Sequence, residues 1–223
     1  MTEHKSIPKK QIKLSQLNED ILKTPSEKTN NEKEKSIDIE DENLNECIQW
    51  ALKGLHEFKK TPDKTIKEQK KEAEIEEKKW GNTMIGQTNN GQWTTKLGEN
   101  LVYNILKLRG ENPKKIKKKG GFQPDWETDE YIYEVKTSNW MVSGTAGEKV
   151  LGTWIKYQDI PELYGKPLRI VCVAYQEYEL EYGKTKYFGE NVTQKTKQIL
   201  DLASKFGIEY IKFSDLVSNF NYK

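Results

Sequence analysis

One short segment holds acidic and basic side chains at a spacing that could support phosphodiester chemistry. If residues 121–127 and 131–137 form a hairpin, side-chain alternation places Asp125, Glu134 and Lys136 on one flank. Neighbouring carboxylates repel each other unless a cation lies between them, and Mg²⁺ commonly binds one or two carboxylates together with a substrate phosphate. The segment therefore indicates Mg²⁺-assisted hydrolysis, in which Lys136 orients the attacking water or stabilises charge on the phosphate.

The register of this hairpin decides which side chains share a flank. We expect a two-residue loop at residues 128–129, so that Asp125 faces Ile132 and Glu127 faces Glu130. The opposite flank carries the side chains that would enter a core, namely Tyr131, Tyr133 and Val135. A competing interpretation is an ordinary exposed strand face, because Glu and Lys two residues apart are common on strands and many Pro-Asp pairs are simply turns.

Hydrophobic patterning predicts the elements that would position this hairpin. Helices are expected over residues 42–60, 95–109, 146–158 and 192–206, and further strands over 168–175 and 208–213. The continuous apolar run at 168–175 is typical of a strand buried on both faces. A hairpin followed by strand–helix–strand predicts an α/β fold whose mixed sheet is flanked by helices.

Composition divides the chain into three parts. Residues 1–40 are polar and of mixed charge, which predicts a disordered tail. Residues 41–79 are expected to form a helical extension and linker, in which the Lys- and Glu-rich stretch 64–79 is a solvated helix or a connection. Aromatic, glycine and β-branched residues become regular from Trp80, so residues 80–223 are predicted to be the domain that carries the chemistry.

Composition also excludes several classes of site and location. The 223 residues carry a net charge of +2 and include only two His and two Cys, too few for a His-rich metal site or a zinc knuckle. No stretch reaches the roughly 18 apolar residues of a membrane-spanning helix, and the first twenty residues hold no apolar secretory segment. We therefore expect an intracellular protein without membrane contact.

Three features fit binding to DNA. A basic run precedes the hairpin, and phosphate contacts from such a run give affinity that falls with salt; its members are Lys114, Lys115, Lys117, Lys118 and Lys119. A polar segment follows the second hairpin strand, with Ser138, Asn139, Trp140, Ser143, Thr145 and Lys149 as candidate DNA contacts. Among the tryptophans of this part of the chain, Trp140 is the one expected to be exposed. The alternatives are a solvated loop for the lysines and a plain connection for the polar segment.

The Pro124-Asp125 pair and the sequence Glu134-Val135-Lys136 resemble the PD-(D/E)xK nuclease signature. The order of the predicted elements is also similar to that superfamily over most of residues 91–175. The surrounding sequence looks closer still to Type II restriction endonucleases of large DNA viruses of algae and their bacterial relatives. That likeness lies in residues 92–99, 133–137, 144–149 and 163–168.

The resemblance implies a restriction-endonuclease-like fold and a role for each motif residue. Asp125 and Glu134 would be metal ligands, Val135 would join the metal-binding set, and Lys136 would be the catalytic lysine. Glu99 occupies the place of the helical acidic residue that often joins such a site. The activity implied is Mg²⁺-dependent, site-specific cleavage of double-stranded DNA, in which water attacks phosphorus and the 3′ oxygen leaves.

Partners follow from that expected activity. Symmetric cleavage of a palindrome would call for a homodimer, or for successive nicking by a monomer. A restriction role would also imply a cognate DNA methyltransferase that protects host or viral DNA. The alternatives are a structure-specific nuclease of DNA repair or recombination, and a DNA-binding module of the same fold without turnover.

Overall fold

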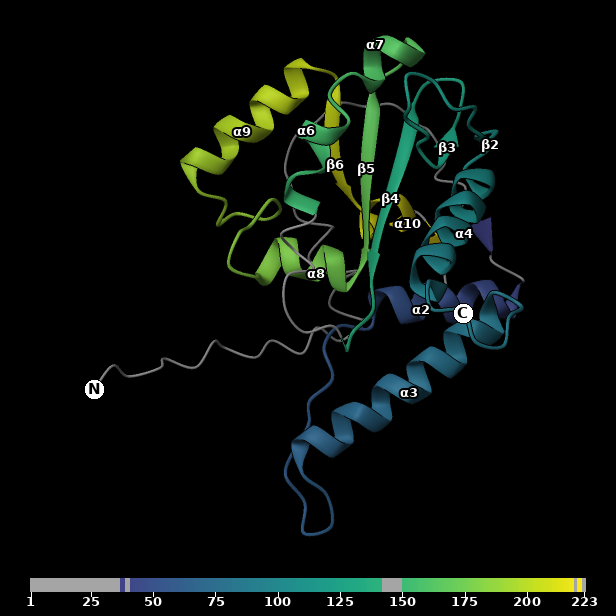
Figure 1. Ribbon diagram of the computed structural model, residues 1–223, viewed down its shortest axis with the longest axis vertical. Coiled ribbons are helices and arrows are strands. Elements are labelled where there is room, and N and C mark those ends of the chain that lie inside the picture. The colour runs from purple at the N-terminus through teal and green to yellow at the C-terminus, as the bar shows by residue number, and fades with distance from the viewer. Residues whose placement is uncertain (1–36, 39–40, 142–149, 219, 222–223) are drawn as a thin grey trace. The chain divides into compact units, whose positions relative to one another are not determined.

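The structure, a computed structural model, describes residues 37–38, 41–141, 150–218 and 220–221 (Figure 1). A five-stranded sheet has the order β2-β3-β4-β5-β6. Its strands are β2 (Lys114–Lys115), β3 (Trp126–Glu127), β4 (Ile132–Ser138), β5 (Leu168–Ala174) and β6 (Ile208–Lys212). Strands β2, β3 and β4 pair antiparallel, whereas β4, β5 and β6 pair parallel, which confirms the predicted mixed sheet. Two short strands, β1 (Ile37–Asp38) and β7 (Phe220–Asn221), pair parallel in a second sheet.

Eight helices are described around this sheet. They are α2 (Glu42–Leu52), α3 (Ile66–Met84), α4 (Trp93–Leu108), α6 (Thr153–Lys156), α7 (Ile160–Tyr164), α8 (Tyr175–Tyr182), α9 (Gln194–Lys205) and α10 (Phe213–Val217). Side chains close the N-terminal ends of several of them. Thr65 and Glu68 form a reciprocal capping box on α3, and the Asp41 carboxylate accepts the backbone N–H groups of Asn43 and Leu44 in α2.

Two hydrophobic cores lie on the two faces of the sheet. On one face, Tyr133 and Val135 of β4 join the core formed with α2, α4 and α10. On the other face, Ile132 of β4 joins a core with residues of α7, α8 and α9. Figure 1 shows α4 on one side of the strands and α6 and α9 on the other. The predicted alternation of β4 is therefore confirmed, and its Glu134 and Lys136 belong to the second face.

Helix α4 lies very close to β4. Gly98 permits this approach, because a Cβ atom there would lie 1.7 Å from Oγ1 of Thr137. That distance is far below van der Waals contact, so no larger residue fits without a shift of backbone. The close approach brings the next residue, Glu99, to the edge of the sheet where the hairpin begins.

The charged stretch 64–79, expected as a solvated helix or a connection, is largely exposed and lies mostly in α3, but one of its acidic residues is buried. Glu77 of α3 is buried, accepts the indole N–H of Trp50 at 2.8 Å and lies 3.5 Å from the ammonium of Lys53. The expectation that Trp140 is exposed is wrong: it is 6% exposed and its indole donates to the carbonyl of Trp50 at 2.8 Å. The polar N–H of a tryptophan permits such burial when a carbonyl is available to accept it. The domain boundary expected after residue 79 lies inside α3.

Several expected elements differ in length. The helix predicted over 42–60 ends at Leu52, and the helix predicted over 146–158 is described only from residue 150 and includes the four-residue α6. Helices α7, α8 and α10 and strand β2 were not predicted. The tail expected at 1–40 lies outside the described residues except for 37–38. Among the described residues, no helix is both long enough and apolar enough to cross a membrane.

Candidate active site

The hairpin that carries the motif has a different register from the one expected. Trp126 pairs with Tyr133 and Glu127 with Ile132, so the two-residue loop is Asp129–Glu130. The expected pairing is therefore wrong, by two residues along one strand. The turn chemistry explains the difference, because the hydroxyl of the buried residue at the start of this turn, Thr128, accepts the N–H of Tyr131 at 3.2 Å.

A shift of two residues leaves every side chain on its expected flank. The observed register also brings the two carboxylates closer together. When the pairing is extended by one residue, Asp125 lies opposite Glu134 rather than Ile132. The backbone N–H of Asp125 donates to the carbonyl of Tyr133 at 3.0 Å. Its side-chain Oδ2 accepts the backbone N–H of Val135 at 2.7 Å. The carboxylate is thus held against the strand that carries the rest of the motif.

Glu134 is a buried carboxylate with two polar partners. Its side chain lies on the face of β4 that carries Lys136, and the residue is only 5% exposed. Oε1 of Glu134 accepts a hydrogen bond from the Lys136 ammonium and another from the hydroxyl of Tyr157 at 3.0 Å. These two donors offset the cost of burying the charge. Lys136 itself is partly exposed, so its ammonium can meet a bound ligand.

Electrostatic repulsion couples the two carboxylates. Burial raises the pKa of Asp125, as do the charges of Glu134 and Glu99, and the pKa reaches about 7. The Val135 N–H and the Lys136 ammonium act in the opposite direction but do not cancel these effects. At neutral pH a proton is therefore partly retained at this pair, and a divalent cation could replace it.

The donor set fits a hard cation such as Mg²⁺. Among the described residues, Oδ1 of Asp125 and Oε2 of Glu134 accept no hydrogen bond, so each carboxylate keeps one oxygen for a ligand. Two carboxylate oxygens suffice when phosphate and water complete the shell. Val135 was expected in the metal-binding set, but its apolar side chain enters the opposite core, so only its backbone is near the site.

Glu99 lies near this pair without completing a three-acid cluster. Its carboxylate pairs with the ammonium of Lys115 at 3.1 Å, and its carbonyl accepts the indole N–H of Trp126 at 3.0 Å. Within the described ranges, no three His, Cys, Asp or Glu side chains form a group that could hold a metal ion. In this arrangement the charge of Glu99 raises the pKa of Asp125.

The basic run lies along the edge of the sheet next to the site. Lys114 and Lys115 form the edge strand β2, and the next three lysines of the run are also exposed. Lys115 lies 4.5 Å from the ring centroid of Trp126. The ammonium of Lys119 lies 4.7 Å from the ring centroid of Tyr164. The run is therefore a partly anchored strand and loop, rather than the wholly solvated loop of the alternative interpretation.

The polar segment after β4 is less accessible than expected. The hydroxyl of Ser138 donates to the side-chain carbonyl of Gln176 at 3.2 Å, and Asn139 is half-buried. Trp140 is held in the core, so its indole cannot stack on DNA bases. The remaining expected contacts, Ser143, Thr145 and Lys149, lie outside the described residues.

Two residues at the site were not expected from the sequence. Tyr157 follows α6 and its hydroxyl binds Glu134, while Nζ of Lys156 lies 3.2 Å from that hydroxyl. Neither residue belongs to a recognisable motif, and only the path of the chain between β4 and β5 brings them to the carboxylates. No local sequence signal could have found them.

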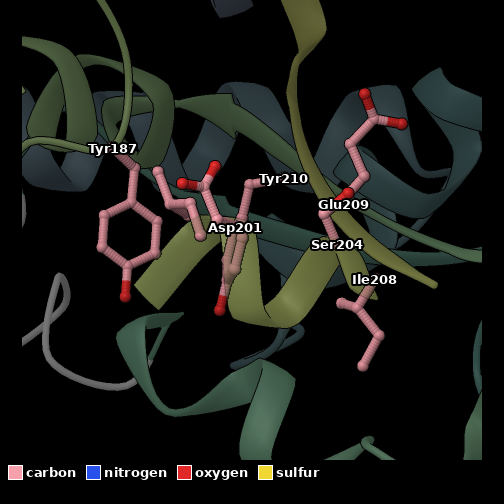
Figure 2. Close-up of a pocket in the computed structure, with 7 residues that line it drawn as sticks. Tyr187, Asp201, Ser204, Ile208, Glu209 and Tyr210 are labelled. Atoms are coloured by element: carbon pink, nitrogen blue, oxygen red, sulfur yellow. The ribbon is translucent and has the colours of Figure 1, made fainter. Parts of the chain in front are cut away.

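A separate pocket opens between α9 and β6 (Figure 2). Its lining residues are Tyr187, Leu200, Asp201, Ser204, Ile208, Glu209 and Tyr210. None of them belongs to the candidate active site. One of its carboxylates, Glu209, is paired with Arg169 at 3.2 Å, and the other belongs to Asp201.

No protein-family model, curated protein or solved structure matches this chain. The assignment of function therefore depends on the geometry of the carboxylate pair and its lysine, together with the motif resemblance.

Proposed function

We propose that this chain is a Mg²⁺-dependent endonuclease of double-stranded DNA with a restriction-endonuclease-like fold. The observation that carries the proposal is the arrangement of Asp125, Glu134 and Lys136 on one flank of the hairpin, where the charge of Glu134 raises the pKa of Asp125. The order of helix α4, hairpin and parallel strands supports the fold assignment by resemblance. Fold alone does not define activity, so the site carries the argument.

Each side chain has a role in the proposed hydrolysis. Asp125 and Glu134 would hold the cation through Oδ1 and Oε2, and Mg²⁺ bound there would polarise the phosphate and favour ionisation of water. The water oxygen would bond to phosphorus and release a proton while the bond to the 3′ oxygen breaks, and the leaving oxygen would take up a proton. Products are a 3′ hydroxyl and a 5′ phosphate. The Lys136 ammonium stabilises the negative charge that develops on the phosphate.

Non-specific DNA affinity would come from the exposed lysines of residues 114–119. Two of them, Lys114 and Lys115, lie in β2, which pairs with β3 directly after Asp125. The short cation–π contact of Lys115 with Trp126 limits the freedom of that lysine without removing its charge. A homodimer, and a methyltransferase as functional partner, remain part of the restriction hypothesis.

Cleavage of plasmid and phage DNA tests the proposal. The full chain is incubated with each DNA in Mg²⁺ or in Ca²⁺, and products are separated by size and sequenced at their ends. We expect discrete fragments in Mg²⁺ only. Lys136→Ala should reduce cleavage at least about 100-fold while DNA binding in Ca²⁺ changes little, because removal of a group that stabilises the transition state commonly costs this much. The matched control is Lys197→Ala, an exposed lysine of α9.

Other outcomes distinguish the alternatives. Cleavage confined to branched or flapped DNA would favour a structure-specific nuclease of repair or recombination. Binding without cleavage under every divalent ion would favour an inactive DNA-binding module. Full activity of Lys136→Ala would refute the role given to this lysine.

A further inference from the structure

Tyr157 lies in the crossover between β4 and β5, between helices α6 and α7. The residue is 6% exposed, and its ring meets that of Phe122 edge-on with centroids 5.9 Å apart. Packing therefore fixes the ring, and with it the position of the hydroxyl. That hydroxyl donates to Oε1 of Glu134 at 3.0 Å.

Two lysines surround the same tyrosine. Nζ of Lys156 lies 3.2 Å from the hydroxyl oxygen and 4.7 Å from the ring centroid. Nζ of Lys136 lies 5.9 Å from that centroid and bonds Glu134 directly. An ammonium can only donate, so Lys156 donates to the tyrosine oxygen and the tyrosine proton is directed to the carboxylate. A fixed chain of donors thus runs from Lys156 through Tyr157 to Glu134.

Both donors to Glu134 meet the same oxygen. Tyr157 and Lys136 converge on Oε1, so the rotation of the carboxylate about its last bond is set and Oε2 is left for another partner. Asp125 is arranged in the same way, since the Val135 N–H occupies Oδ2 alone. Groups that orient a ligand in this manner commonly change metal affinity by 10–100-fold when removed.

We propose that Tyr157 is a positioning residue that orients Glu134 so that Oε2 can bind the divalent cation. This inference rests on the proposed function. It assigns to a buried tyrosine outside the motif a share of the Mg²⁺ affinity. A purely structural tyrosine would instead contribute only to the stability of the fold, through its buried ring and one satisfied hydroxyl.

Calorimetric titration of the full chain with Mg²⁺, without DNA, separates these roles. Tyr157→Phe keeps the packed ring and removes the hydroxyl. Tyr210→Phe is the matched control, because Tyr210 is also buried and its hydroxyl, which donates to the carbonyl of Val150 at 2.8 Å and accepts the N–H of Trp154 at 3.3 Å, has no contact to the carboxylates. We expect Tyr157→Phe to weaken Mg²⁺ binding about tenfold and Tyr210→Phe to leave it unchanged. Thermal unfolding without metal should shift similarly in both.

Cleavage provides a second readout. The Mg²⁺ concentration for half-maximal cleavage should rise about tenfold in Tyr157→Phe, while the rate at saturating Mg²⁺ stays near that of the unmodified protein. Equal Mg²⁺ affinity in the two variants would overturn the inference and leave the proposed function intact. Failure of the unmodified protein to bind Mg²⁺ would overturn both, so the two failures are distinguishable.

Discussion

The carboxylate of Asp125 accepts the backbone N–H of Val135 at 2.7 Å, just beyond the last residue pair of β3 with β4. The side-chain oxygen of Asp125 thus adds one more hydrogen bond between the two strands, beyond their last backbone residue pair. The contact places Asp125 beside Glu134 before any ligand arrives. A site arranged in advance loses little conformational entropy when it binds a cation, but the free protein must tolerate the repulsion.

Asp125→Asn should therefore stabilise the metal-free protein. A carboxyl whose pKa is raised in the folded state binds its proton more tightly there, so stability is lost as pH rises from about 4 through about 7. Removal of the charge should raise the unfolding free energy at pH 8 by about 1–3 kcal/mol, given about 1.4 kcal/mol per pKa unit and partial exposure. Chemical denaturation at pH 5 and pH 8 measures this. A variant less stable than the parent at pH 8 would contradict the repulsion.

Mg²⁺ affinity should rise with pH. Only the ionised Asp125 can bind the cation, and its pKa of about 7 means that a proton competes at neutral pH. We expect binding at pH 6 to be about tenfold weaker than at pH 8, with most of the change between pH 7 and pH 6. Calorimetry in buffers of constant ionic strength gives the curve. A flat profile between pH 6 and pH 8 would show that the proton does not compete.

Glu99→Gln should move this pH profile to lower pH. The charge of Glu99 raises the pKa of Asp125, so its neutralisation makes Asp125 easier to ionise. Cleavage at saturating Mg²⁺ should fall only modestly, since Glu99 pairs with Lys115. An unchanged midpoint would restrict Glu99 to helix packing, whereas a large loss of cleavage would place it in the metal shell.

Gly98→Ala should destabilise the fold. The added Cβ would lie 1.7 Å from Oγ1 of Thr137, so α4 must move away from β4. Such overpacking costs about 1–3 kcal/mol. Gly91→Ala is the control, because nothing lies within 4 Å of a Cβ at that position. Urea denaturation of the two variants compares them, and equal stability would mean that the helix adjusts without strain.

The lysines at 117–119 should set the salt dependence of DNA binding. All three are exposed, and each one that contacts a phosphate adds roughly 0.9 to the slope of log affinity against log salt concentration. Replacement of the three by Ala should therefore reduce the slope by about 2–3. Measurement in Ca²⁺ at several salt concentrations gives the slope. An unchanged slope would assign these lysines to solvent alone.

The periodic elements of this fold were predictable because their signal is local. The apolar run of β5 indicated a strand buried on both faces, and this is confirmed. The alternation in β4 indicated a strand whose side chains point alternately to the two faces of the sheet, which is also confirmed. The register of the hairpin was not predictable to the residue. It depends on the hydroxyl of Thr128, which closes a turn one residue later than composition suggests.

Long-range contacts explain the other differences. Nothing in the sequence near Tyr157 indicates a carboxylate neighbour, because Glu134 reaches it through the fold. Likewise, the charged composition of α3 favours a solvated helix, yet Glu77 is buried by partners far along the chain. A charged segment can thus contribute a buried residue to the folded protein when hydrogen-bond partners elsewhere in the chain satisfy its carboxylate.

The bonds of Glu77 have a practical consequence for any shortened version of this protein. Its Oε1 accepts hydrogen bonds from the indole N–H of Trp50 and from the backbone N–H of Trp140. Trp140 lies shortly after the end of β4. Helices α2 and α3 therefore support the C-terminal end of β4, the strand that carries Glu134. A fragment that begins at residue 80 would lack Trp50 and Glu77. It would therefore expose the Trp140 indole and remove the contacts that hold the C-terminal end of β4.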